Sequence, residues 1–93
     1  MKKSGIYILE SRRKKIFYIG STNDIERRLK QHNDGLVRAT WFYKPWDLKT
    51  FIECASLTEA KKSEYRLKQY KNRKILIKVV KDGIFPWNHK KGL

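Results

Sequence analysis

The sequence has only one cysteine and two histidines, and no apolar run in it approaches the length of a membrane span. A single cysteine, Cys54, cannot form an internal disulfide, and we expect it to be a small core residue. With only His32 and His89 beside it, there are too few soft ligands for a zinc site. The apolar run at residues 6–9 is too short for the core of a signal peptide. We therefore expect a cytoplasmic protein without a targeting segment, a disulfide or a zinc site.

Acidic residues are also scarce, since nine Asp and Glu accompany 23 Lys and Arg for a formal net charge of +14. From Lys61 onward the only acidic residues are Glu64 and Asp82. A positive field of this size favours a polyanionic partner, and the second half is predicted to be a phosphate-facing surface. Charge alone does not separate DNA from RNA, and ribosome-associated proteins carry similar patches. The length predicts a single domain over residues 1–93.

Two short β-branched and aromatic runs open the chain, at residues 6–9 and 16–19. The charged segment between them, residues 11–15, predicts a hairpin turn. Directly opposed residues of an antiparallel pair share a face, so a register that pairs Tyr7 with Tyr18 brings the two phenols together. The same register pairs position 5 with 20 and position 9 with 16. A slip of one residue would send the phenols to opposite faces.

A first helix is predicted over residues 23–34. Asn23 is the expected N-cap, Glu26 stands at capping-box spacing, and Gly35 is the expected left-handed stop. Arg27, Lys30 and Gln31 are assigned to its outer face.

Two polar residues of this helix fall on its inward side. Arg28 and His32 lie three and seven residues after Ile25, so both are predicted to point toward the sheet. Taken alone, Arg28 is more simply explained by a surface ion pair with Asp24, four residues earlier. His32 alone is more simply explained as a packed or capping histidine.

The segment from residue 35 to 46 is predicted to be a loop, with Trp46 packed over the sheet edge. Trp41 and Tyr43 are candidates for stacking on bases, although ordinary loop packing gives the same sequence pattern. A third strand is expected over residues 48–55. Its alternation places four residues on one face: Leu48, Thr50, Ile52 and Cys54.

A second helix is predicted over residues 58–70, with Ser56 and Glu59 at capping-box spacing. Glu64 lies on its inward stripe, where an unpaired carboxylate is costly unless a cation meets it. That cation is either a metal ion or Lys68, four residues later. A third helix is expected over residues 72–81 and should end at Gly83, although its β-branched content also suits a buried strand.

The triplets Gly5-Ile6-Tyr7 and Tyr18-Ile19-Gly20, followed by Ser21-Thr22 and then by Arg28 and His32, resemble the GIY-YIG nuclease family. The closest resemblance is to its small single-domain bacterial members. The chain is also similar to the catalytic domains of the excision-repair incision subunit and of phage homing endonucleases. Thr40 before Pro45-Trp46, and Ala60 four residues before Glu64, extend the resemblance over most of the chain. The predicted fold is α+β, with a small, mostly antiparallel three-stranded sheet flanked by helices.

The resemblance implies a metal-dependent endonuclease that hydrolyses phosphodiester bonds in DNA, selective for structure or active in repair or recombination, with one Mg²⁺ or Mn²⁺ ion. It makes Tyr7 the general base, and Tyr18 the residue that orients the water or the phosphate. Arg28 would clamp the phosphate, His32 would contact phosphate or assist proton transfer, and Glu64 would hold the metal. A phenol has a pKa near ~10. The base must therefore either be acidified by a cation such as Arg28 or Lys14, or pass its proton along a relay.

Other residues are assigned to nucleic-acid binding: Lys14, Arg38, Thr40, Lys68, Lys71, Arg73 and Lys74. Asn88 is a candidate for the asparagine that some family members place after the metal helix. DNA is preferred to RNA as the partner. Two alternatives remain at this point: a non-catalytic nucleic-acid-binding protein of the same fold, and an RNA-directed or ribosome-associated factor.

Overall fold

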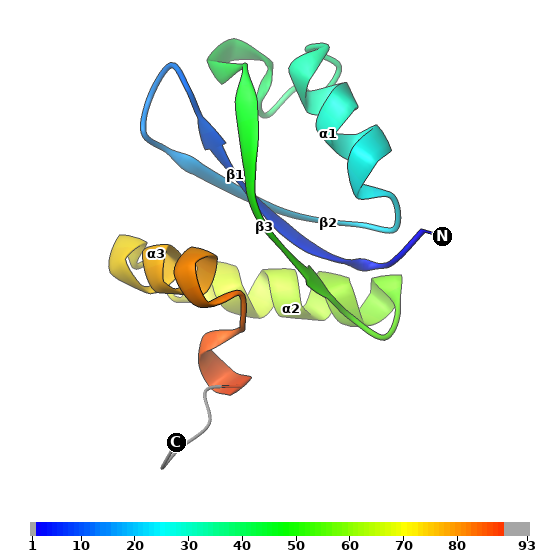
Figure 1. Cartoon of the computed structure of the whole chain (residues 1–93), viewed down its shortest axis with the longest axis vertical. Coiled ribbons are helices and arrows are strands. Elements are labelled where there is room, and N and C mark those ends of the chain that lie inside the picture. The colour runs from blue at the N-terminus through cyan, green and yellow to red at the C-terminus, as the bar shows by residue number, and fades with distance from the viewer. Residues whose placement is uncertain (1, 89–93) are drawn as a thin grey trace.

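The computed structural model describes residues 2–88, so His89 lies outside the described residues. A three-stranded antiparallel sheet forms its centre, with one helix on one face and two helices on the other (Figure 1). The predicted α+β architecture is therefore confirmed. In residues 2–88 no helix is both long enough and apolar enough to cross a membrane.

The sheet has the order β2-β1-β3, which makes the first strand the central one. Its strands are β1 (Gly5–Ser11), β2 (Phe17–Thr22) and β3 (Trp46–Glu53). Successive side chains of β1 point to opposite faces. Ile6 and Ile8 pack on the side of the second and third helices, whereas Tyr7 and Leu9 pack on the side of the first. A central tyrosine is thereby held inside the fold.

The hairpin register differs by two residues from the predicted one. Tyr7 is paired with Gly20, and Leu9 is paired with Tyr18. The turn sets this register, because the Ser11 backbone donates to the Ile16 carbonyl at 3.1 Å and leaves residues 12–15 as the loop. A shift of two preserves the face, so the two phenol rings remain neighbours, with centroids 6.4 Å apart.

The third strand carries an irregularity that the alternation did not reveal. Ile8 is opposite Thr50, but Leu9 is opposite Leu48, so Lys49 is bulged out of the ladder. Neighbouring residues of β1 face opposite sides, and Leu48 and Thr50 therefore also face opposite sides. The prediction that Leu48 shares a face with Thr50 is wrong for this reason.

The first helix, α1 (Ile25–Asn33), is capped by Asp24, so the predicted cap at Asn23 is wrong by one residue. The Asp24 carboxylate accepts a hydrogen bond from the Arg27 backbone at 3.2 Å. Gly35 has a φ of 78°, which confirms it as the left-handed stop after the helix.

Two more helices cover the other face of the sheet. Ser56 caps α2 (Leu57–Gln69) through the Glu59 backbone at 3.1 Å, as predicted. The segment that suited a helix or a strand forms a helix, α3 (Arg73–Asp82), which Gly83 ends at a φ of 72°.

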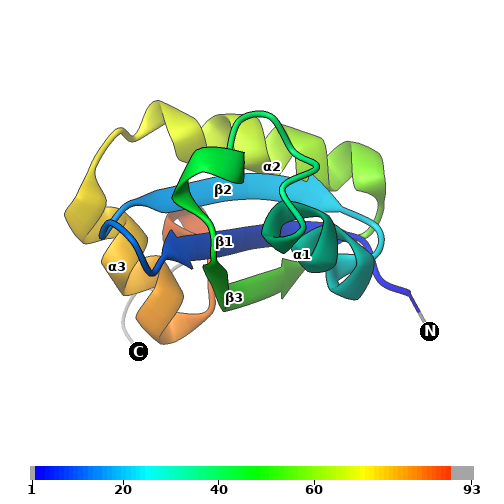
Figure 2. The same cartoon turned by 90° about the horizontal axis from the view of Figure 1, so that it is seen from above.

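The segment between α1 and β3 crosses the sheet on the same face as α1, in front of the strands in Figure 2. It contains a single 3-10 turn, η1 (Trp41–Tyr43), before the chain enters β3. Trp46 is 4% exposed, and its indole nitrogen donates to the Thr40 carbonyl at 3.0 Å, so its predicted packing over the sheet is confirmed.

Candidate active site

Three residues singled out in the sequence, Tyr7, Arg28 and His32, converge on one cluster beneath α1. Tyr7 is 1% exposed and His32 is fully buried. The Tyr7 hydroxyl lies 2.8 Å from His32 Nε2, and His32 Nδ1 lies 2.6 Å from Thr40 Oγ1. Three segments distant in the sequence are thus joined by one hydrogen-bonded chain: β1, α1 and the loop before η1.

The direction of the hydrogen bonds from Tyr7 through His32 depends on Thr40, the last residue of this network. Thr40 Oγ1 has one proton and lies 3.4 Å from the Val37 carbonyl and 2.6 Å from His32 Nδ1; with that proton in the bond to Val37, Thr40 accepts from Nδ1. His32 Nε2 is then unprotonated and accepts the Tyr7 proton. Burial, and secondarily the charge of Arg28, lower the pKa of His32 from 6.5 to about 4, which keeps the imidazole neutral at pH 7.

Arg28 reaches the same hydroxyl, as its predicted inward orientation requires. Its Nε donates to the Tyr7 oxygen at 3.3 Å, and its Nη1 donates to Gln31 Oε1 at 3.0 Å. Asp24, the alternative partner of Arg28, instead caps the helix, and its Oδ2 lies 3.5 Å from Lys2 Nζ. Gln31 therefore turns toward Arg28 rather than toward the outer face.

The pKa of Tyr7 is raised rather than lowered. Burial of the phenol raises it, and the hydrogen bond and charge of Arg28 oppose this only in part. The expectation that a neighbouring cation acidifies this tyrosine is wrong. The relay through His32 is the alternative that the geometry favours.

Tyr18 lies beside the cluster rather than in its hydrogen-bonded chain. Its ring centroid is 5.2 Å from that of His32 and 6.2 Å from that of Trp46. Lys68 Nζ stands 5.9 Å from the same ring, from the side of α2. Tyr18 is half-buried, so part of its ring is accessible to solvent at the edge strand β2, beside the buried cluster.

Glu64 approaches this edge from α2. Its Oε1 accepts a hydrogen bond from Ser21 Oγ at 2.6 Å, and its Oε2 accepts one from Lys68 Nζ at 2.6 Å. The ion pair with Lys68, the simpler of the two explanations, is therefore present. The Glu64 side chain is 21% exposed, so solvent reaches the carboxylate.

The donor set is compatible with a cation that is shared with a substrate. In residues 2–88 no group of three or more His, Cys, Asp and Glu residues could enclose a metal ion. Mg²⁺, however, is commonly bound through one or two carboxylates, with water and substrate phosphates as its other ligands. Glu64 fits that mode if the ammonium of Lys68 moves aside.

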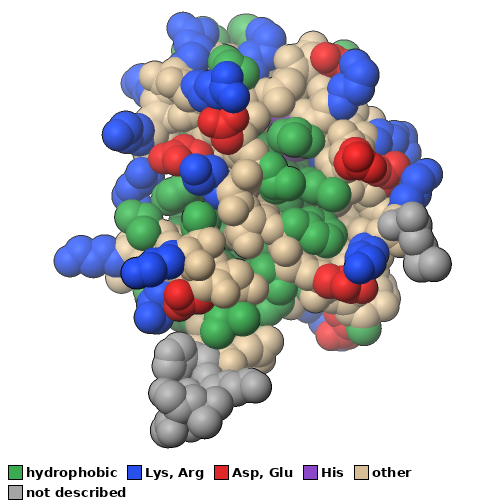
Figure 3. Space-filling view, viewed as in Figure 1, with side chains coloured by type: hydrophobic (Ala, Val, Ile, Leu, Met, Phe, Trp, Pro, Cys, Tyr) green, Lys and Arg blue, Asp and Glu red, His purple; other side chains and the backbone are tan. Residues whose placement is uncertain are grey.

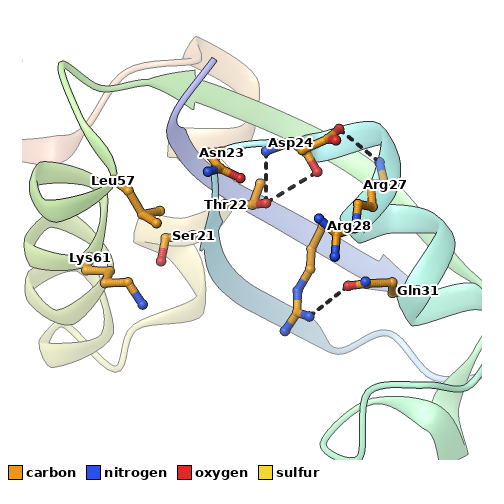
Figure 4. Close-up of a pocket in the computed structure, with 9 residues that line it drawn as sticks. All are labelled: Ser21, Thr22, Asn23, Asp24, Arg27, Arg28, Gln31, Leu57 and Lys61. Atoms are coloured by element: carbon orange, nitrogen blue, oxygen red, sulfur yellow. Dashed lines mark hydrogen bonds between the residues drawn. The ribbon is translucent and has the colours of Figure 1, made fainter. Parts of the chain in front are cut away.

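An open pocket adjoins the cluster where β2 ends and α1 begins (Figure 4). Its volume is about 290 Å³. Arg27 and Arg28 line it from α1 and Lys61 lines it from α2. The remaining lining residues are mostly polar: Ser21, Thr22, Asn23, Asp24, Gln31 and Leu57. Three cations around a hollow of this kind suit a phosphate group.

Two predicted site residues lie elsewhere than expected. Thr40 is fully buried, so it supports His32 instead of contacting nucleic acid. Asn88 lies in η2 (Pro86–Asn88), which follows α3 on the face of the sheet opposite to Tyr7 (Figure 1). Its candidacy for the site is wrong, because the segment after α3 packs Phe85 and Trp87 against the other core cluster.

The predicted nucleic-acid-binding cations are exposed but fall into separate groups. Lys14 and Arg38 lie in the loops at one end of the sheet, whereas Lys71, Arg73 and Lys74 surround the junction of α2 and α3. Arg73 is partly engaged, since its guanidinium carbon is 4.5 Å from the centre of the Phe17 ring.

Three residues of this region had no assigned site role in the sequence interpretation: Ser21, Gln31 and Lys61. The spacing of Gln31, three residues after Arg28 on the same helix, was the signal available for it. Ser21 and Lys61 contact the site only through the packing of α2 on β2, which sequence spacing does not report.

Comparison with family models gives one match, over residues 3–76, to the model described as the GIY-YIG catalytic domain. No curated protein and no solved structure gives a significant match. The matched residues include all three strands, both triplets, Arg28, His32 and Glu64.

Proposed function

The chain belongs to the GIY-YIG catalytic domain family, which is of the nuclease type, and from that premise we propose that it is a DNA endonuclease assisted by one divalent cation. The single observation that supports this most is the buried chain from Tyr7 through His32 to Thr40, with Arg28 on the same phenol oxygen. Any buried hydroxyl is expected to have a hydrogen-bond partner, but here one partner is a guanidinium that also lines the adjoining open pocket.

In this proposal Tyr7 is the general base and His32 is its proton acceptor. As an attacking water gives a proton to the Tyr7 oxygen, the phenol's own proton passes to His32 Nε2, so the number of protons is conserved. The raised pKa of Tyr7 and the lowered pKa of His32 keep both groups neutral before attack. Thr40 accepts from Nδ1 and stabilises the imidazolium that forms.

Arg28 and Glu64 are the proposed ligands of the phosphate and of the divalent cation. Beyond its bonds to Tyr7 and Gln31, the Arg28 guanidinium has further N–H groups for the phosphoryl oxygens. Glu64 would hold Mg²⁺ or Mn²⁺, which supplies Lewis-acid charge beside the leaving oxygen when it is bound. Lys68 then exchanges its bond to Glu64 for a contact with the substrate backbone. Tyr18 orients the water or the scissile phosphate.

The decisive experiment compares Glu64→Gln with Glu59→Gln, an exposed position on the same helix. Both variants remove one carboxylate, but only the first removes the proposed cation ligand. We expect Mg²⁺-dependent cleavage to fall by orders of magnitude in Glu64→Gln alone, while DNA binding persists or tightens as repulsion disappears. Substrates should include branched, flapped, duplex and single-stranded DNA, together with RNA.

If Glu64 is only the ion-pair partner of Lys68, the loss appears in thermal stability and cleavage survives. If the parent protein binds DNA but cuts none of these substrates with Mg²⁺ or Mn²⁺, it is a non-catalytic binder. Cleavage confined to RNA would instead identify an RNA-directed nuclease.

A further inference from the structure

The end of the molecule that carries η1 exposes large aromatic side chains. Trp41 is 49% exposed and Phe42 is 54% exposed, and their rings meet edge to face with centroids 5.5 Å apart. Tyr43, which the sequence suggested as a stacking residue, is half-buried instead. We refer to the exposed pair Trp41 and Phe42 as the aromatic platform.

The aromatic platform is held in place by the β1–β2 loop. The Arg13 guanidinium donates to the Phe42 carbonyl at 3.1 Å and lies 5.4 Å from the centre of its ring. Ser11 Oγ donates to the Tyr43 carbonyl at 2.6 Å, and Lys14 Nζ stands 5.9 Å from the Tyr43 ring. These contacts fix a surface turn that buries neither exposed ring, so stability of the fold alone does not explain the two aromatics.

The charge around the aromatic platform has one sign. The two segments that build this end, residues 11–16 and 35–45, contain six Lys and Arg and no Asp or Glu (SRRKKI and GLVRATWFYKP). Arg12 is paired with Asp47 at 2.8 Å, whereas Arg13 lies against the Phe42 ring and Lys14 against the Tyr43 ring. Lys and Arg side chains are exposed at this end in the space-filling view, as they are around much of the rim of the molecule (Figure 3). Aromatic faces within a cationic surface suit unpaired nucleotides, whose bases stack while their phosphates are neutralised.

The aromatic platform is also directly connected to the proposed cleavage centre. Thr40, which bonds His32, is the residue immediately before Trp41. Tyr43 packs in the same cluster as Tyr7 and Trp46. The platform thus follows the residue that bonds His32, and His32 lies about one helical turn after Arg28 on α1.

We propose that the aromatic platform stacks unpaired bases next to the scissile bond, so that the preferred substrate carries single-stranded nucleotides there. This inference rests on the proposed nuclease function and adds the substrate class to it. Duplex DNA presents its bases to each other, and it would contact only the cations around the rings. The platform thus discriminates by base accessibility rather than by sequence.

The test is equilibrium binding in the presence of a chelator, so that no cleavage occurs. The probes are an oligothymidylate and a mixed-sequence duplex of equal length. Trp41→Ala and Phe42→Ala should each weaken binding of the oligothymidylate by roughly tenfold or more, because each removes one stacking face. Duplex binding, which depends on backbone charge, should change by less than about twofold. Phe42→Leu keeps the apolar bulk without the aromatic face and should behave like Phe42→Ala.

Tyr65→Ala is the matched control, because this tyrosine is 70% exposed on α2, away from the platform. It should leave both affinities unchanged. Equal losses for the two probes, or no loss for either, would overturn the inference. Cleavage measured in parallel separates the two proposals. Loss of oligothymidylate binding in the platform variants, without Glu64-dependent cleavage by the parent, would support base stacking and overturn the nuclease proposal. Glu64-dependent cleavage with unchanged oligothymidylate binding in those variants would support the nuclease proposal and overturn base stacking.

Discussion

The Tyr7 hydroxyl lies 2.8 Å from His32 Nε2, and both groups are buried. Burial raises the pKa of the phenol and lowers the pKa of the imidazole to about 4, so neither is charged at neutral pH. The pair has capacity for one proton transfer, because the phenol can give the proton that the imidazole is placed to accept. Structural and catalytic roles for this pair make different quantitative predictions.

Tyr7→Phe removes one oxygen and preserves the ring. A structural role would cost about 1–3 kcal/mol of unfolding free energy, since His32 Nε2 is left unpaired. A general base should lose on the order of 10²-fold or more in cleavage rate as well. We expect the larger rate loss at Tyr7 and a smaller one in Tyr18→Phe, measured under single-turnover conditions. If both variants cut at the parent rate while Glu64→Gln is inactive, neither phenol is the base.

The depressed pKa of His32 makes the stability of the fold depend on pH. The folded state holds His32 neutral down to about pH 4, whereas the unfolded chain protonates it near 6.5, so the unfolded state binds more protons between these values. Stability should therefore fall as pH falls through this window, by about 3 kcal/mol in total for this residue.

The measurement is urea unfolding of the parent and of His32→Gln from pH 7 to pH 4. Carboxylates contribute equally to both proteins, so the difference between the two curves isolates His32. A constant difference across this range would mean that the buried imidazole is not held neutral.

Most of the fold was predictable from local signals. Caps and stops located the helices to within a few residues, because Ser56 and the glycines at 35 and 83 act on the backbone directly. The hairpin register and the bulge at Lys49 were not predictable, since a turn length and a single extra residue leave the hydrophobic alternation almost unchanged.

The candidate site was predictable only where its residues share an element or a family motif. Helical spacing correctly predicted that Arg28 and His32 point toward the sheet. The family resemblance pointed to Thr40 but not to its role, because its contact with His32 depends on how the loop returns over the sheet. The direction of the Tyr7 pKa shift was also not predictable. The sequence shows the neighbouring cations, which lower the pKa, but not the burial, which raises it by more.

The basic residues at the α2–α3 junction should contribute to the salt dependence of DNA binding. Replacing Lys71, Arg73 and Lys74 with Gln should flatten the log-log slope by roughly 0.9 for each phosphate that is no longer neutralised. Because Arg73 also stacks on Phe17, the variant with Lys71 and Lys74 alone replaced separates charge from packing.

The matched control replaces Lys30 and Lys62 with Gln. Each of these lysines already has an acidic partner nearby: Lys30 is paired with Asp34, and Lys62 is paired with Glu59. This control removes the same formal charge as the double variant and should leave the slope nearly unchanged. Equal slopes for the junction variant and the parent would place the binding face elsewhere.

Gly20 leaves the space that the Tyr7 phenol occupies. It is paired with Tyr7 across the hairpin, and a Cβ at this position would overlap the Tyr7 hydroxyl and ring. Gly20→Ala should therefore push the ring away, cost about 1–3 kcal/mol of stability by overpacking, and separate the hydroxyl from His32. The rate loss should approach that of Tyr7→Phe.

Two comparisons decide whether this loss acts through Tyr7. Gly83→Ala is the control, because its φ of 72° makes it strained while nothing lies near its Cβ, so it should lower stability and spare cleavage. In the double variant with Tyr7→Phe, Gly20→Ala should add almost no further rate loss, since the hydroxyl it displaces is already absent. Additive losses would show that Gly20 acts on another group, and a fully active Gly20→Ala would mean that Tyr7 can move without penalty, which is incompatible with its role as a fixed base.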